Sequence, residues 1–322
     1  MVEVQSMIVN KRFNFNFGIS EPKQKNNIVL FYLSSKEKIK SNLISFPEAF
    51  SKDLVKVEEV NDKGIVRYLK VTNISDQKLL ILESEQIIGN GIKQNRVVDS
   101  TTLIPEFSNI TLKVSCCEKN RWSPSVANEL NLSDSLYFSK GRINNSEDIY
   151  KKRNTDQFKI WEDISDKLKE IGSRSFTGSV EDIYNKRRNN VEEIVNSFNP
   201  GPNDIGVAIA TANCLVSLDI FSSNDVFKIY LPKLIRSVAL DSFKKTGYKS
   251  FVKTADVYKL LRLIEHSEKK IDEPNMGTLG QQIRFNSGLV VGSSLYYEEE
   301  MIHFSGFLKD NSDIPQYKSE VA

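Results

Sequence analysis

Hydrophobic and polar positions alternate in short runs along the first third of the chain, a pattern that predicts β-strands. The runs "NIVLFYLS", "DLVKVEEV", "GIVRYLKVTN" and "KLLILES" each have strand length, and polar turns such as "NISDQ" separate them. Turn signals about every 8–12 residues are typical of a sandwich or small barrel. Between the strands, "SFPEAFSKD" predicts one or two helical turns with Pro47 at an early position. We therefore expect residues 1–122 to form a β-rich, sandwich-like or barrel-like part.

The period then changes, and a helical segment is expected over residues 123–200. From Ser146 to a stop near Gly172, apolar residues recur at every third or fourth position, which places them on one helical face. Those residues are Phe158, Trp161, Ile164, Leu168 and Ile171. Ser179 is expected to cap a second helix, and "NPGPND" ends it because prolines cannot continue a helix.

Residues 201–310 predict a strand-helix-strand part, followed by a tail over residues 311–322. "IGVAIATANCLVSLDIF" reads as two strands, and Ser222 or Ser223 then caps a long helix that Pro232 kinks. A shorter helix is expected near residues 256–266, before the closing strands of "QQIRFNSGLVVGSSLYYEEEMIHFSGFL". The expected fold class is α+β, in one continuous two-lobed body.

Composition limits the environment and the partners. The chain has 322 residues, 39% of them hydrophobic, which suffices for one large core or two ordinary ones. Its 44 basic and 42 acidic side chains nearly cancel, so no overall field attracts nucleic acid or an anionic membrane. No stretch approaches the roughly 20 apolar residues of a membrane-spanning helix, and the N-terminal segment does not resemble a signal peptide. We expect a cytoplasmic protein with neither a membrane nor a nucleic acid as partner.

The cysteine and histidine content argues against disulfide and metal chemistry. Three cysteines suit a reducing compartment, and we expect Cys116 and Cys214 to be buried, unbridged thiols in apolar strands. The two histidines, His266 and His303, are far apart, so neither a metal site nor a cofactor is expected. His303 is the one histidine placed where a base would be useful, although a core or edge position is favoured. Asp219, which precedes a helix, reads as a cap or a catalytic carboxylate, with the cap favoured.

A first polar segment, "GNGIKQNRVVDS" (residues 89–100), carries candidate chemistry. Gly89 and Gly91 permit backbone conformations closed to other residues, and Arg96 offers a planar fork of donors suited to phosphate or carboxylate. Gln94 and Asn95 add paired donors and acceptors. The segment reads either as an anion or nucleotide contact or as a hairpin turn whose amides satisfy exposed backbone groups. It has the spacing of neither a Walker loop nor a dinucleotide fingerprint.

A second polar segment, "VSCCEKNRW" (residues 114–122), ends another expected strand. Alternation sends Cys116 and Glu118 to one face and Cys117 to the other, which weakens any paired-thiol idea. Glu118 with Arg121 reads either as a substrate clamp, with the carboxylate as acid/base, or as a structural ion pair. Trp122 closes the segment. Because sequential strands usually neighbour each other, the two polar segments are expected to lie side by side.

These segments carry a resemblance to a known family. The succession "LLILESEQIIGNGIKQNRVVDSTTLIP", "LKVSCCEKNRW", "GVAIATANCLVSLDIFSSNDVFKIYLPKLIRSVALDSF" and "GLVVGSSLYYEEEMIHFSGF" resembles the ADP-ribosylglycohydrolase-and-rhodanese-phosphatase-associated protein domain, over roughly residues 40–307. The chain has two cysteines where this family usually has one. The resemblance implies a context of nucleotide, NAD-derived or phosphate signals. It also implies that the site residues are Gln94, Asn95, Arg96, Glu118, Arg121 and Trp122.

Three classes of function follow from the sequence. The first is a ligand-binding or regulatory protein that recognises a nucleotide or ADP-ribose-like molecule in a stress or defence context. The second is a hydrolase acting on such a molecule with Glu118 as acid/base. The third is a scaffold whose polar segments are structural and whose function lies in a protein partner. The scarcity of histidine and the missing metal motif favour binding over catalysis.

Overall fold

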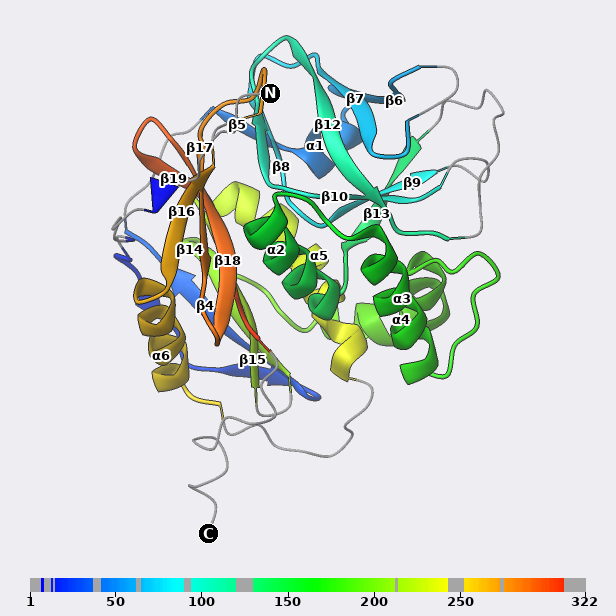
Figure 1. The fold of residues 1–322 in the computed structure, drawn as a ribbon. Helices are drawn as coiled ribbons and strands as arrows, with labels where there is room; N and C mark the ends of the chain where they lie inside the picture. The colour runs from blue at the N-terminus through cyan, green and yellow to red at the C-terminus, as the bar shows by residue number, and fades with distance from the viewer. Residues whose placement is uncertain are drawn as a thin grey trace.

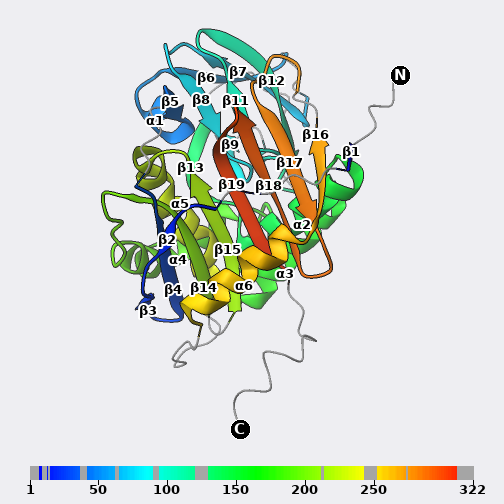
Figure 2. The ribbon, with the colours of Figure 1, turned by 90° about the vertical axis from the view of Figure 1, so that its left-hand side faces the viewer.

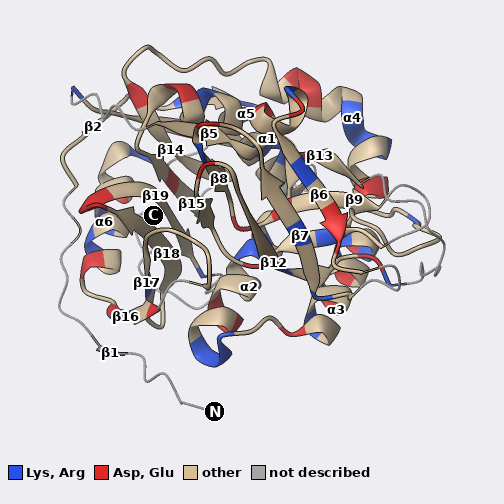
Figure 3. Cartoon of the chain, turned by 90° about the horizontal axis from the view of Figure 1, so that it is seen from above, with Lys and Arg blue, Asp and Glu red and all other residues tan. Residues whose placement is uncertain are grey.

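The fold is α+β and rich in strands, as predicted (Figure 1). The computed structural model describes residues 7–8, 13, 15–36, 42–61, 65–89, 94–119, 130–211, 214–242, 252–272 and 275–309. Within these ranges, no helix combines the length and the apolar character that crossing a membrane would require. Acidic and basic residues are interspersed on most elements (Figure 3).

One large antiparallel sheet combines strands from both ends of the chain. Its strands are β1 (Met7–Ile8), β2 (Gly18–Ile19), β3 (Lys23–Lys25), β4 (Ile28–Ser34), β14 (Asp204–Thr211), β15 (Cys214–Phe221), β16 (Glu268–Asp272), β17 (Gln281–Asn286), β18 (Val290–Tyr297) and β19 (Glu300–Leu308). Their order is β1-β16-β17-β18-β19-β15-β14-β4-β2, and β3 pairs with β4. The apolar run that forms β4 therefore pairs with β14 rather than with the strands that follow it in sequence.

Two smaller sheets form the second part of the body. The six-stranded sheet has the order β13-β9-β10-β12-β7-β6, and the three-stranded sheet has the order β11-β8-β5. Their strands are β5 (Leu43–Ser45), β6 (Val55–Glu59), β7 (Tyr68–Asn73), β8 (Lys78–Ile81), β9 (Glu85–Gly89), β10 (Arg96–Val98), β11 (Thr102–Ile104), β12 (Ser108–Cys116) and β13 (Leu130–Leu136). Helix α1 (Phe46–Ser51) begins where predicted, because the Ser45 side chain accepts a hydrogen bond from the Glu48 N–H.

The remaining helices are α2 (Ser139–Lys152), α3 (Gln157–Glu170), α4 (Glu181–Val195), α5 (Asn224–Ser242) and α6 (Thr254–Glu265). The prediction of one helix from Ser146 to Gly172 was wrong, because the chain turns between α2 and α3. Arg153 has a left-handed φ of 53° at the end of α2, and the Asp156 carboxylate then caps α3.

Helices on both faces of the large sheet explain why β4 is apolar throughout. Ile28, Leu30 and Tyr32 pack into the core shared with α5, whereas Val29 and Phe31 pack into a second core beneath α6. Figure 2 shows α6 lying across the large sheet. A third core fills the space between α1 and the two smaller sheets. Strands covered on both faces read as continuous apolar runs, because alternate side chains enter different cores.

Candidate functional site

The two polar segments of the sequence lie side by side, as predicted. Strand β10 pairs antiparallel with β12, and Arg96 is opposite Cys116. The backbone N–H of Asn95 donates to Oε2 of Glu118 over 3.1 Å. The second segment therefore meets the first through a carboxylate that accepts a backbone hydrogen bond.

Asn95 connects three parts of the structure through its side chain. Its Oδ1 accepts a hydrogen bond of 3.0 Å from the Gly89 N–H, and its Nδ2 donates to Oγ of Ser179 over 3.0 Å. Oγ of Ser179 in turn accepts a hydrogen bond from the Glu181 N–H at the start of α4, but the N-cap residue is Val180, so the prediction of Ser179 as the cap was off by one residue. These contacts tie β9, β10 and α4 together within the protein.

Arg96 is fully buried, and its guanidinium contacts protein groups. Nε donates to the Val66 carbonyl over 3.0 Å, Nη1 donates to the Gln94 carbonyl, and Nη2 lies 3.2 Å from Oε1 of Glu59. The carboxylate paired with Arg96 is thus Glu59 on β6 rather than Glu118. This geometry favours a structural role for Arg96, because its Nε, Nη1 and Nη2 atoms all contact groups of the protein itself.

Several predicted site residues lie outside the described part of the chain. Gly91, Arg121 and Trp122 belong to this group. Gln94 and Glu118 are described and buried. A ligand contact at these polar segments therefore stays a prediction.

The cysteines differ from one another in exposure. Cys116 and Cys117 are buried, and burial raises the pKa of both thiols. Both therefore favour the protonated, weakly nucleophilic form. The prediction that Cys214 is buried was wrong, because Cys214 begins β15 at the exposed end of the β14–β15 hairpin.

His303 and Asp219 belong to a buried ion-pair network. Asp219 Oδ1 lies 2.7 Å from Nη2 of Arg142 and 3.7 Å from Nε2 of His303. Burial alone would raise the pKa of Asp219, but the Arg142 guanidinium and His303 outweigh it and lower the pKa. Asp219 lies within β15 and binds α2 to the sheet, so its reading as a helix cap was wrong.

A groove between the smaller sheets and the large sheet was not predicted. Two adjacent cavities of about 270 and 200 Å³ share three lining residues, Arg153, Asp272 and Arg284. We call them together the interlobe groove. The walls come from β12, the end of α2, β16, β17 and the turn before β17, and Figures 1 and 2 show β12 and β17 at the same end of the molecule.

Basic side chains outnumber acidic ones in the interlobe groove. The smaller cavity, which we call the basic chamber, also contains Tyr150. The larger cavity, the mixed chamber, includes the apolar side chains of Leu112, Leu279 and Leu295. Across both chambers the acidic lining residues are Asp99 and Asp272, and the basic ones are Lys113, Lys151, Lys152, Arg153, Lys270 and Arg284.

Asp272 organises the arginines at the junction of the chambers. Its Oδ2 lies 2.5 Å from Nε of Arg284, and its Oδ1 lies 3.7 Å from Nη2 of Arg153. Nη2 of Arg284 donates to Oγ of Ser100 over 2.9 Å. Among the described residues, the two guanidinium groups therefore share the carboxylate of Asp272.

A second acidic group, Asp99, lies in the wall of the mixed chamber. Oγ of Ser115 donates to Asp99 Oδ1 over 2.7 Å, and Oγ1 of Thr155 donates to Oδ2 over 3.5 Å. Burial raises the pKa of Asp99, although its hydrogen bonds and the nearby Lys113 and Arg67 partly oppose the shift. A buried carboxyl with a raised pKa in a cleft marks a candidate functional residue.

The groove residues come from separate segments of the sequence, so no local spacing reveals them. Lys113 alternates with apolar neighbours on a strand, and Arg153 follows a run of exposed lysines on a helix. Each pattern is typical of solvated surface. Only the pairing of β10 with β12 and the return of the chain through β16 and β17 bring them together.

Comparison with known proteins identifies one family. The model of the ARG and Rhodanese-Phosphatase-superfamily-associated Protein domain matches residues 16–307. The match begins at residue 16, whereas the sequence segments indicated the resemblance from about residue 40. The matched region therefore also includes β4, and it includes the residues that line the groove. No curated protein and no solved structure matches the chain.

Proposed function

The chain belongs to the ARG and Rhodanese-Phosphatase-superfamily-associated Protein domain family, and from this premise we propose that it binds a nucleotide or ADP-ribose-like molecule in the interlobe groove. The phosphate lies at the junction of the two chambers. The sugar or base lies in the mixed chamber. A cytoplasmic, regulatory role in a stress or defence response, exerted through a protein partner, belongs to the same proposal.

The observation that carries this proposal is the placement of Arg153 and Arg284 beside both chambers. Arginine presents donors in a planar fork that matches the oxygens of a phosphate. The carboxylate of Asp272 contacts both side chains and holds the two guanidinium groups near each other, so an anion bound at the junction could contact both. Lys270 and the lysines at the end of α2 extend the positive surface of the basic chamber.

The mixed chamber suits the less charged part of such a ligand. Leucine side chains provide apolar surface, and Thr102, Asn275 and Gln282 provide polar groups in the same cavity. Binding sites for small molecules commonly combine apolar walls with a few polar groups that fix orientation. A nucleoside has this same combination of a planar face and hydrogen-bonding edges.

Calorimetry with ADP-ribose, AMP and adenosine tests the proposal. We expect the two phosphate-containing molecules to bind at least ten times more tightly than adenosine, because a hydrogen bond to a charged group contributes about 1.5–3 kcal/mol. Arg153→Gln removes one cation from the junction and is expected to weaken ADP-ribose binding by about tenfold or more. The matched control is Arg188→Gln, because Arg188 is an exposed helical arginine paired with Asp134 away from the groove.

The outcomes separate the classes of function. Equal affinity of Arg153→Gln and Arg188→Gln for ADP-ribose would move the ligand away from the groove, toward the polar segments around Asn95. Absence of binding by all three molecules would leave the scaffold function as the better explanation. Measurements at low and at physiological salt add a check, because a phosphate contact weakens as ions screen it.

A further inference from the structure

Lys113 on β12 lies opposite Asp99, the residue that follows β10, in the wall of the mixed chamber. The register that pairs Val98 with Val114 continues outward to this pair, and the Asp99 N–H donates to the Lys113 carbonyl over 3.3 Å. Directly opposite residues of an antiparallel pair have Cβ atoms about 4.5–5.5 Å apart on the same face. Both residues line the mixed chamber.

The surroundings of Lys113 lower the pKa of its amine. Burial lowers the pKa of Lys113, and the cations Arg67 and Arg284 lower it further, while Asp99 opposes them. The Nζ atom donates a hydrogen bond of 3.0 Å to the Arg153 carbonyl at the end of α2, which fixes the amine beside the chamber junction. A lysine desolvated next to other cations is the arrangement that makes an amine nucleophilic near neutral pH.

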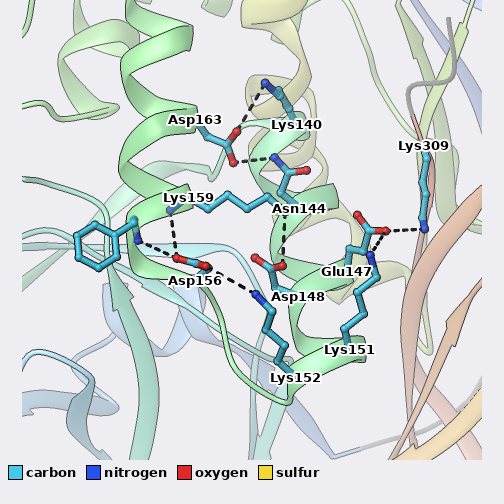
Figure 4. Close-up of polar contacts among 11 residues, drawn as sticks. Lys140, Asn144, Glu147, Asp148, Lys151, Lys152, Asp156, Lys159, Asp163 and Lys309 are labelled. Carbon is cyan, nitrogen blue, oxygen red and sulfur yellow. Dashed lines mark hydrogen bonds and ion pairs between the residues drawn. The ribbon is translucent and has the colours of Figure 1, made fainter.

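The other lysines of the groove are held differently. Lys151 lies 2.8 Å from Glu147 and Lys152 lies 3.7 Å from Asp156. Figure 4 shows the first pair along α2 and the second between the end of α2 and the start of α3. Lys270 lies 4.2 Å from the centre of the Tyr150 ring and 3.5 Å from Glu268. These three lysines contact carboxylates or an aromatic ring, whereas the amine of Lys113 contacts a backbone carbonyl beside the junction of the chambers.

We propose that Lys113 forms an imine with the aldehyde of a phosphorylated sugar whose phosphate lies at Arg153 and Arg284, with Asp99 as the proton donor. This inference deepens the proposed function and rests on it. It names the reactive end of the ligand as an aldose that opens to its aldehyde.

The step balances without a further reactant. The lone pair of Nζ forms a bond to the carbonyl carbon, and the π electrons move to the oxygen, which takes the proton of the Asp99 carboxyl. The nitrogen then returns a proton to the Asp99 carboxylate, and Asp99 gives it to the hydroxyl, which leaves as water. The lone pair of the nitrogen forms the C=N bond as the water leaves, so the products are the protonated imine, one water molecule and the Asp99 carboxylate. Burial of Asp99 suits it to hold the proton with which this sequence begins.

Borohydride trapping with ribose 5-phosphate tests the inference in the full-length protein. We expect reduction to leave a covalent sugar phosphate on Lys113, located by peptide mass mapping of the wild-type chain, with at least tenfold higher occupancy than any other lysine. Lys113→Arg is expected to abolish this adduct, and Asp99→Asn is expected to slow its formation at least tenfold. The matched control is Lys70→Arg, because Lys70 is an exposed lysine on β7 of the same sheet, paired with Glu58.

Ribitol 5-phosphate, which has no carbonyl group, separates this inference from the proposed function. Binding of ribitol 5-phosphate together with no enrichment of the adduct on Lys113 would overturn the imine while leaving the anion site standing. Adducts spread evenly over surface lysines would overturn it as well. Absence of ribitol 5-phosphate binding would instead count against the groove itself. Peptide mass mapping of the adduct in the wild-type chain shows whether Lys113 is the modified residue, even where a variant fails to fold.

Discussion

Arg96 and Glu59 form an ion pair in which Nη2 lies 3.2 Å from Oε1, with exposed fractions of 0% and 4% for the two side chains. The pair joins β10 to β6, the edge strand of the six-stranded sheet, and β12 and β7 lie between these two strands in the sheet order. A charge in such a position depends on its partner, because water cannot solvate it when the partner is removed.

We therefore expect Arg96→Ala to lower the free energy of unfolding by about 3–5 kcal/mol, since Glu59 would stay buried without its counter-ion. Urea denaturation of the ligand-free protein measures this loss. The control is Lys52→Ala, which removes the exposed pair with Glu48 and should cost less than about 1 kcal/mol. A loss for Arg96→Ala as small as that of the control would favour a ligand contact for Arg96 over the structural role.

Much of the fold could be predicted from the sequence because each strand and helix carries its own period. The runs that form β4, β6, β7 and β8 were predicted as strands, and α4, α5 and α6 were predicted as helices. The pairing of β4 with β14 could not be predicted, because both strands are apolar on two faces and the sequence gives no register between distant runs. Strand β13 was missed, since its alternation is weak and polar.

The candidate site was less predictable than the fold. Asn95 and Glu118 were expected to meet because sequential strands usually neighbour each other. They do meet, although β11 lies between β10 and β12 in the sequence and belongs to another sheet. Arg96 was predicted as a donor to an anion, but its guanidinium pairs with Glu59 on β6, which is separated from β10 by β12 and β7 in the sheet. The groove unites Lys113, Arg153 and Arg284 through long-range sheet pairing, which no local pattern encodes.

The cysteines give a prediction about reactivity. We expect a polar thiol reagent to label one cysteine of the folded protein rapidly, and we expect that cysteine to be Cys214, because it is exposed. Cys116 and Cys117 should react only after unfolding, since burial raises their pKa and excludes the reagent. Cys214→Ser should remove the rapid phase. Rapid labelling that persists in this variant would contradict the burial of the adjacent pair.

Glu147 gives a prediction about pH. Burial would raise the pKa of this carboxyl, but hydrogen bonds from Lys151 and Lys309 lower it from 4.5 to about 2 (Figure 4). A carboxyl with a depressed pKa stabilises the folded state above its unfolded pKa, and this contribution disappears as the pH falls from about 4.5 toward 2.

Glu147→Gln should therefore be less stable than the wild type at pH 7, by no more than about 1 kcal/mol because the pair is partly exposed. The difference should shrink as the pH falls below 4.5. Chemical denaturation of both proteins at several pH values between neutral and acidic measures it. A difference that stays constant down to the lowest pH would show that the lysine contacts do not depress the pKa of Glu147.

The last prediction concerns the close approach of β18 to β19. A Cβ atom added to Gly292 would lie 2.1 Å from the Ser305 carbonyl oxygen, 2.4 Å from the Phe285 ring and 2.9 Å from Cα of Gly306. Two of these contacts are backbone atoms in the middle of the large sheet, so no side-chain rotation relieves them. Gly292→Ala is expected to lower the free energy of unfolding by about 1–3 kcal/mol or more, because the strands must separate to admit the methyl group.

Gly288→Ala is the matched control, since a Cβ there meets nothing within 4 Å. That variant should be neutral or slightly stabilising, because alanine reduces the entropy of the unfolded chain. Urea denaturation of the two variants at the same pH measures their free energies of unfolding. Equal values would show that the space between β18 and β19 admits a methyl group at position 292, contrary to the 2.1 Å contact with the Ser305 carbonyl oxygen.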